Sequence, residues 1–260
     1  MLKTPIILFL SFVCLVANSQ NDSIVATRAI CADLDMKGNV YYIDSSYELC
    51  KQTKGVTTNR FSLTNYGEGP VIDASNPLEV FVFYENSGIL LIMDNNLNPV
   101  QEVNLYSANN IRVQGFGRAN EGKIWVFDAN SYTLKKYDRT GTLVTESVML
   151  NKGSEQKTKG INKIFDNGAL VAFQQGQQNT LVLNNNLKVL FNKANNSRLV
   201  GLEGNAILEQ DKNTLNKRDI TTTNKQTKTM LSSSINGEIV CAIQGRMLML
   251  NKHTLKLKTY

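Results

Sequence analysis

A unit of about forty residues recurs six times along the chain, and this repetition limits the possible fold more than any other feature of the sequence. Each unit starts at a polar turn, usually with glycine, and continues as a short apolar run, a polar loop, a second short run and a terminal polar residue. The recognisable central part of each repeat, called a unit below, spans residues 37–53, 76–94, 121–138, 167–184, 203–219 and 236–251. Their runs are short and rich in Val, Ile, Tyr, Phe and Thr, which is typical of β-strands.

One more short run precedes each unit and another follows it, so each repeat supplies four strands. Around the last two units, the runs predicted as strands are 198–202, 220–224, 229–235 and 254–260. A single four-stranded sheet cannot bury both of its faces, whereas similar sheets packed face to face around an axis can. The sequence therefore predicts an all-β fold, a β-propeller of six four-stranded blades. Residues 22–27 are a candidate outer strand for the last blade, and a ring of five or seven blades is the open alternative.

The first nineteen residues have the composition of a secretory signal peptide. Lys3 precedes an apolar run from Pro5 to Ala17, and a small-polar exit ends at Ser19. This run is shorter than the roughly 20 residues that span a bilayer, and no later stretch is apolar enough, so no transmembrane segment is predicted. We therefore expect a signal peptide at 1–19 and a single propeller domain at 20–260. The predicted location is the periplasm, the periplasmic side of the outer membrane or the cell exterior.

Histidine and cysteine usage narrows the possible chemistry. His253 is the only histidine, which argues against Ser/His/Asp and Cys/His catalysis and against metal sites built from several histidines. Cys31, Cys50 and Cys241 remain after the predicted signal peptide, without the close spacing of a zinc site, and we expect them in the core. The formal net charge is +6, spread thinly along the chain, and with export it argues against nucleic acid as a partner.

Two units carry a closer resemblance to a known family. The strings GNVYYID at 38–44 and GKIWVFDANSYTLKKYDRTG at 122–141 resemble the repeat of NHL-type and related six-bladed propellers. The positions that match best are Gly122, Trp125, Asp128, Asn130, Leu134, Tyr137, Asp138 and Gly141. The resemblance implies one of two roles, a platform that binds proteins or nucleic acids, or a calcium-dependent lactonase or hydrolase with a central metal held by acidic and amide side chains. Fold alone does not choose between these roles.

The loops of such a propeller open on two opposite faces. The loops between first and second strands define the first face, and five of the six units place an acid there. These acids are Asp35, Asp73, Glu121, Asp166 and Glu203. The loops between second and third strands and the connections between blades define the second face, which is rich in amides and lysines. The candidate partner contacts on the second face are Tyr132, Gln174, Gln175, Lys157, Lys193 and Arg198.

The expected function is that of an exported, non-enzymatic interaction scaffold for an envelope protein or an outer-membrane assembly, with no cofactor and no catalytic residue. The alternative is a calcium-dependent hydrolase, for which Asp33, Asp73 and Asp166 are the candidate ligands of a central calcium ion. Residues 115–120 (GFGRAN) imitate a dinucleotide-binding loop without its third glycine or a following helix, so we expect a turn there. Trp125 lies in an apolar run and is expected between blades.

Overall fold

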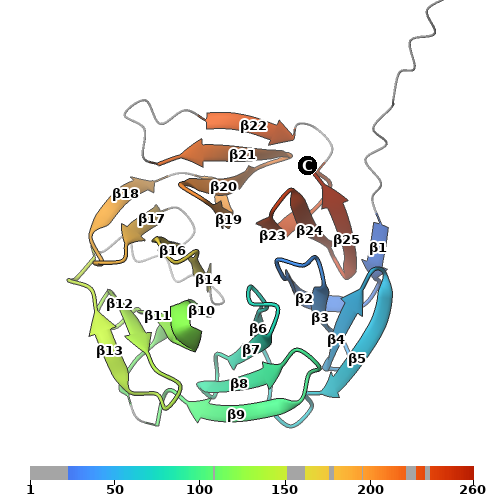
Figure 1. The fold of residues 1–260 in the computed structure, drawn as a ribbon, viewed down its shortest axis with the longest axis horizontal. Helices are drawn as coiled ribbons and strands as arrows, with labels where there is room; N and C mark the ends of the chain where they lie inside the picture. The colour runs from blue at the N-terminus through green and yellow to red at the C-terminus, as the bar shows by residue number, and fades with distance from the viewer. Residues whose placement is uncertain are drawn as a thin grey trace, which may run out of the picture.

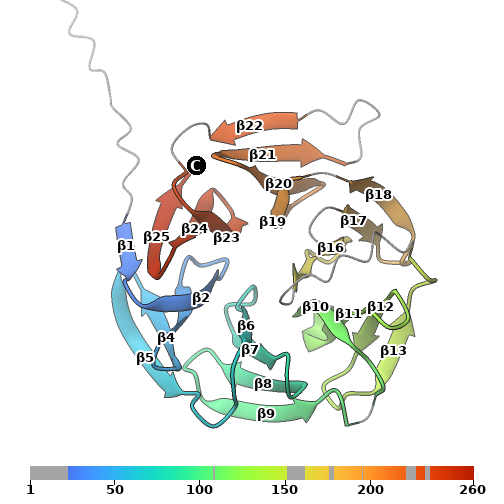
Figure 2. The same cartoon turned by 180° about the vertical axis from the view of Figure 1, so that it is seen from behind.

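The computed structural model describes residues 23–107, 109–150, 162–175, 179–194, 196–220, 227–231 and 235–260. These residues form six sheets that stand as blades around a central axis (Figure 1 and Figure 2). Among them is one short 3-10 turn, η1 (Asn120–Gly122), and no helix long and apolar enough to cross a membrane. The predicted all-β propeller of six blades is confirmed.

In each blade, four antiparallel strands follow one another from the axis outward. The first and second blades are β2 (Ala29–Leu34), β3 (Val40–Asp44), β4 (Glu48–Thr53) and β5 (Val56–Ser62), then β6 (Pro70–Asp73), β7 (Glu79–Tyr84), β8 (Ile89–Asp94) and β9 (Pro99–Asn104). The third and fourth are β10 (Val113–Arg118), β11 (Ile124–Asp128), β12 (Thr133–Tyr137) and β13 (Leu143–Glu146), then β15 (Phe165–Asp166), β16 (Leu170–Gln175), β17 (Asn179–Asn184) and β18 (Val189–Ala194). The fifth and sixth are β19 (Arg198–Glu203), β20 (Ala206–Asp211), β21 (Thr214–Asp219) and β22 (Thr227–Leu231), then β23 (Glu238–Ile243), β24 (Arg246–Asn251), β25 (Thr254–Thr259) and β1 (Ser23–Ala26).

The ring closes because the two ends of the described chain share the sixth blade. Strand β1 pairs antiparallel with β25, with Ser23 opposite Leu257. This confirms the outer strand expected from residues 22–27.

The strand positions predicted around the last two units are wrong in part. Residues 227–231 form the outer strand of the fifth blade, whereas the sequence predicts 229–235 as the inner strand of the sixth. Residues 254–259 form the third strand of the sixth blade and not the fourth, and most of the predicted strand at 220–224 lies outside the described residues. In the sixth blade the Asn236-Gly237 pair precedes the inner strand, whereas in the other blades the corresponding turn follows the inner strand. Since β1 supplies the outer strand, the last unit needs only three strands of its own.

The core lies between blades. The side chains that face the neighbouring blade are apolar, and the rings of Phe83 and Phe116 stack across the second and third blades with centroids 4.9 Å apart. Trp125 is 1% exposed and packs with Phe127 and Phe173 between the third and fourth blades, as expected. Burial of such large rings is the main apolar stabilisation of each contact between blades.

The innermost part of the fourth blade is split. A short strand, β14 (Asn162–Lys163), leaves this blade and pairs parallel with β10 of the third, with Lys163 opposite Phe116. An ideal Cβ on Gly117 would lie 2.1 Å from the carbonyl oxygen of Ile164, so only glycine permits this approach. The turn expected at 115–120 is therefore wrong in its first half, because residues 115–118 belong to β10 and the glycine admits a neighbouring backbone.

Candidate binding site at the mouth of the central channel

The first face is hollowed at the propeller axis by a cavity of about 1000 Å³. Turns from several blades line it, and they contribute both charged and apolar side chains. Three lining side chains are apolar and still largely exposed, namely Met36 at 49%, Leu78 at 61% and Val100 at 58%. The acids in the lining are Glu79, Asp94, Glu121, Asp166 and Glu203, and the bases are Arg118 and Arg139. The acidic character expected for the first face is thus present in this lining.

A triad of charged side chains joins two blades in the cavity wall. Glu79, at the start of β7, accepts hydrogen bonds from Arg118 of β10 at 2.7 Å and from Arg139, in the turn after β12, at 2.5 Å. Burial alone would raise the pKa of Glu79, but the hydrogen bonds from Arg139 and Arg118 hold it below its usual value. The guanidinium of Arg118 also lies 4.9 Å from the centre of the Phe81 ring. Each charged group of the triad is thus paired with another charged group of the protein.

A second group of charges lies deeper on the axis. Asp33 of β2 and Asp73 of β6 are 1% and 2% exposed, and the ammonium of Lys163 donates to Oδ2 of Asp33. The same oxygen accepts the N–H of Ala74 at 2.7 Å, and Asp73 accepts the N–H of Arg118 at 2.7 Å. Burial would raise the pKa of Asp73, but the charge of Lys163 and these hydrogen bonds lower it. Each of the two aspartates therefore bonds the inner strand of the next blade.

Asp166 is likewise part of a contact between blades. Its Oδ2 accepts the indole N–H of Trp125 at 2.7 Å, and its Oδ1 accepts the N–H of Gly168 at 2.7 Å. Among the described residues, Asp33, Asp73 and Asp166 do not come close enough together to share one metal ion. Most of their oxygens already accept hydrogen bonds, so this arrangement does not fit a common calcium site, which takes six or more oxygens.

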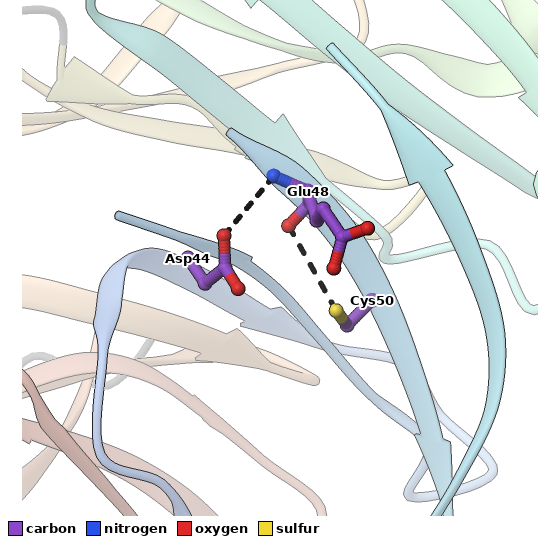
Figure 3. Close-up of side chains that lie close together, drawn as sticks. All are labelled: Asp44, Glu48 and Cys50. Carbon is purple, nitrogen blue, oxygen red and sulfur yellow. Dashed lines mark hydrogen bonds between the residues drawn. The ribbon is translucent and has the colours of Figure 1, made fainter. Parts of the chain in front are cut away.

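Within the described part of the chain, the side chains that do gather like metal ligands are Asp44, Glu48 and Cys50 in the first blade (Figure 3). Asp44 accepts the N–H of Glu48 at 3.1 Å, and the Glu48 carboxylate pairs with Arg60 at 2.9 Å. Burial raises the pKa of the Cys50 thiol, which disfavours the thiolate that a metal needs. These contacts shape the turn between β3 and β4, and they point to no ligand.

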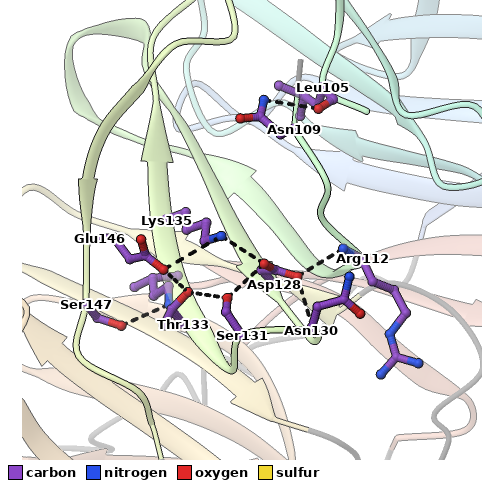
Figure 4. Close-up of polar contacts among 11 residues, drawn as sticks. Leu105, Asn109, Arg112, Asp128, Asn130, Ser131, Thr133, Lys135, Glu146 and Ser147 are labelled. Atoms are coloured by element: carbon purple, nitrogen blue, oxygen red, sulfur yellow. Dashed lines mark hydrogen bonds and ion pairs between the residues drawn. The ribbon is translucent and has the colours of Figure 1, made fainter. Parts of the chain in front are cut away.

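The equivalent turn of the third blade shows how the second face is built (Figure 4). Asp128, at the end of β11, accepts hydrogen bonds from the N–H groups of Arg112 at 3.0 Å and Asn130 at 2.9 Å. It also accepts the hydroxyl of Ser131 at 2.8 Å and the ammonium of Lys135 at 2.9 Å. The aspartate of the NHL-like string is therefore a structural residue that fixes the loop between second and third strands.

The predicted partner contacts on the second face lie in different environments. Tyr132 is half-buried against the core of the third and fourth blades. Gln174 and Gln175 are buried, and Gln174 donates to the carbonyl of Ser197 at 2.8 Å. The others are Lys193, which is exposed, Arg198, which is exposed and pairs with Glu238, and Lys157, which lies outside the described residues. The buried amides present little surface to a partner.

Sequence reasoning missed several residues at the axis, above all Glu79, Arg118 and Arg139 in the lining of the first-face cavity and Lys163 beneath it. Their partners are far away in sequence, so no local motif marks them. The one available signal is a lysine within the apolar run of residues 161–165. His253, by contrast, is exposed in the turn between β24 and β25, on the second face.

No protein-family model matches the chain, and no curated protein matches it in sequence. Solved structures are similar in fold. A streptogramin B lyase has a TM-score of 0.61 at 11% identity, over 92% of this chain and 87% of that chain. A catalytically inactive histidine-to-alanine variant of virginiamycin B lyase from Staphylococcus aureus, solved with quinupristin, has a TM-score of 0.59 at 11% identity, over 90% and 81%.

The WD40 domain of Pan2 from Neurospora crassa is also similar, with a TM-score of 0.54 at 10% identity, over 90% of this chain and 74% of that chain. At such low identity these similarities show the fold alone, and the fold serves enzymes and binding modules alike. The NHL-like assignment stays a prediction, because no family model supports it. The comparisons place the chain among structures of the β-propeller fold.

Proposed function

We propose that this propeller is a non-enzymatic interaction scaffold of the cell envelope, and that it binds a partner protein at the cavity of the first face. Residues 1–19 support export, because their composition is that of a signal peptide. The cavity supports the choice of face, since it is large, open and lined by turns of several blades. In this proposal a protruding loop or chain end of the partner enters the depression.

The observation that carries a binding role is the state of the cavity's carboxylates. A general base that works near neutral pH needs a raised pKa and a free oxygen. Glu79 and Glu203 instead have lowered pKa values, and the oxygens of Glu79 accept hydrogen bonds from two guanidinium groups while those of Glu203 accept from the Lys217 ammonium and the Tyr260 hydroxyl. Asp166 is similarly occupied by Trp125 and Gly168. These carboxylates are arranged to hold blades together and are poor bases.

The exposed apolar side chains in the cavity lining favour a protein partner. Met36 and Leu78 lie in the turns between inner and second strands of the first and second blades, and Val100 lies in β9. Apolar anchors surrounded by charged groups are typical of protein interfaces, and a well-placed anchor contributes about 1 kcal/mol or more to binding.

The test is a crosslinked pull-down of the tagged protein from its own envelope fraction, with three variants compared with the natural sequence. The Met36→Asp/Leu78→Asp variant changes the first face, Lys193→Glu/Arg198→Glu changes the second, and Val144→Asp alters an exposed apolar residue on the outer strand β13. We expect the first variant alone to lose a stoichiometric partner. Each variant must keep the melting temperature of the parent within a few degrees.

Loss in the second-face variant alone would move the contact to the face that the sequence favoured. A complete absence of partners with every protein would contradict the scaffold role.

A further inference from the structure

Two carboxylates are buried in the contact network at the propeller axis. Asp33 is 1% exposed and Asp73 is 2% exposed, and they come from the inner strands of neighbouring blades. Burial of two negative charges is costly unless positive charge or hydrogen bonds compensate it. Backbone N–H groups donate to one oxygen of Asp33, from Ala74, and to both oxygens of Asp73, from Ser75 and Arg118, but they do not cancel the negative charges.

The positive charge at this site comes from a short strand that has left its own blade. Lys163 belongs to β14, which leaves the fourth blade and pairs with β10, and its side chain is 14% exposed. Its ammonium donates to Asp33, and the charges of Asp33 and Asp73 both raise its pKa, so it stays protonated although burial opposes this. Gly117 allows this strand pairing because it has no Cβ that would collide with the backbone of Ile164.

We propose that Lys163 is a built-in counter-ion, whose ammonium takes the place that a divalent cation would occupy between Asp33 and Asp73 at the propeller axis. A cavity of about 50 Å³ lies beside Asp73, Lys163 and Cys241, so a variant that lacks the ammonium has room there for a cation. Burial strongly raises the pKa of the Cys241 thiol, so this side chain adds no charge. One ammonium and two carboxylates thus leave a net charge of −1.

This inference is independent of the proposed scaffold role, and it bears on the calcium-dependent alternative. A cation that polarises a substrate needs open coordination positions and accessible carboxylate oxygens. In this protein the ammonium and backbone N–H groups bind Oδ2 of Asp33 and both oxygens of Asp73, and of these four oxygens only Oδ1 of Asp33 has no hydrogen-bond partner among the described residues. The chain itself thus supplies the positive charge that offsets one of the two carboxylates, and the natural protein should gain no stability from calcium or magnesium.

The experiment measures the melting temperature with EDTA, with 5 mM calcium chloride and with 5 mM magnesium chloride. Lys163→Met retains the length of the side chain and removes its charge, and Lys188→Met is the matched control at an exposed lysine. We expect Lys163→Met to melt at a lower temperature in EDTA and to gain about 3 °C or more with calcium, because a ligand that binds only the folded state stabilises it. The natural protein and the control should change by less than about 1 °C.

A second variant keeps the test decisive if Lys163→Met does not fold. Asp33→Asn/Lys163→Met removes one charge of each sign and keeps the net charge at −1, so it should fold and should not respond to calcium. A calcium-dependent rise in the melting temperature of the natural protein would overturn the proposal. So would a folded Lys163→Met variant that ignores both cations, or a double variant that fails to fold.

Discussion

Replacement of Gly117 by alanine should push the third and fourth blades apart at the axis. An ideal Cβ at this position lies 2.1 Å from the carbonyl oxygen of Ile164 and 2.9 Å from its carbonyl carbon, both of them backbone atoms. Ordinary carbon–oxygen contacts are about 3.3 Å or longer, so the backbone at Ile164 must retreat by about 1 Å. That movement strains the hydrogen bond of 2.8 Å from the Ile164 N–H to the Phe116 carbonyl.

The expected loss of stability follows from these two effects. Overpacking of a tight contact costs about 1–3 kcal/mol, and a weakened backbone hydrogen bond costs about 1 kcal/mol. Alanine also restricts the unfolded chain, which returns about 0.5 kcal/mol. Gly117→Ala should therefore destabilise the protein by about 2.5 kcal/mol, which lowers the melting temperature by roughly 5–10 °C for a domain of this size.

The assay is thermal unfolding followed by circular dichroism, and the matched control is Gly115→Ala in the same strand. An ideal Cβ on Gly115 lies 3.1 Å from the Cβ of Phe127, where a shift of a few tenths of an ångström relieves the contact, so the loss should be less than half as large. Equal melting temperatures for the two variants would refute the reasoning, since the backbone contact would then carry no special cost.

Two other predictions concern the acid sensitivity of the fold and its ring closure. Burial would raise the pKa of Asp128, but hydrogen bonds, including those from Arg112 and Lys135, lower it, so its stabilisation is present above about pH 4 and is lost as the pH falls through the folded-state value. Asp128→Asn should therefore lower the melting temperature at pH 7 and flatten its decline between pH 5 and pH 3, whereas an unchanged decline would argue against this assignment. Deletion of residues 23–26 removes β1 from the sixth blade and should lower the melting temperature, as thermal unfolding of the shortened protein can show; an unchanged value would mean that β1 adds nothing to closure.

The architecture could be predicted because each blade is encoded locally. Strand lengths, glycine turns and the aspartate that ends β3 or β11 all lie within one unit, and together they indicate four strands per repeat. The strand positions around the last two units were missed in part, because the outer strand of the sixth blade comes from the opposite end of the chain. No pattern inside the last unit indicates that its outer strand comes from residues 23–26.

The candidate site was harder to predict, because its contacts join distant parts of the sequence. Asp33 and Lys163 are 130 residues apart, and Glu79 and Arg139 are 60 residues apart. Asp33, Asp73 and Asp166 were named as candidate calcium ligands, yet only the structure shows that each bonds a neighbouring blade. Gly117 resembled part of a nucleotide-binding loop because close backbone approach and phosphate binding both require a residue without a side chain.

Closure through β1 gives the molecule a built-in order of assembly. The first five blades can form from hairpins of neighbouring strands, whereas the sixth is complete only after β1 pairs with β25, where Ser23 lies opposite Leu257. Pairing across so long a stretch of chain has a large loop-closure entropy, and folds dominated by such contacts fold slowly. Until that pairing forms, the packing faces of the first blade and of the unfinished last blade are both exposed, so the open ring is the species most prone to associate with another copy of itself.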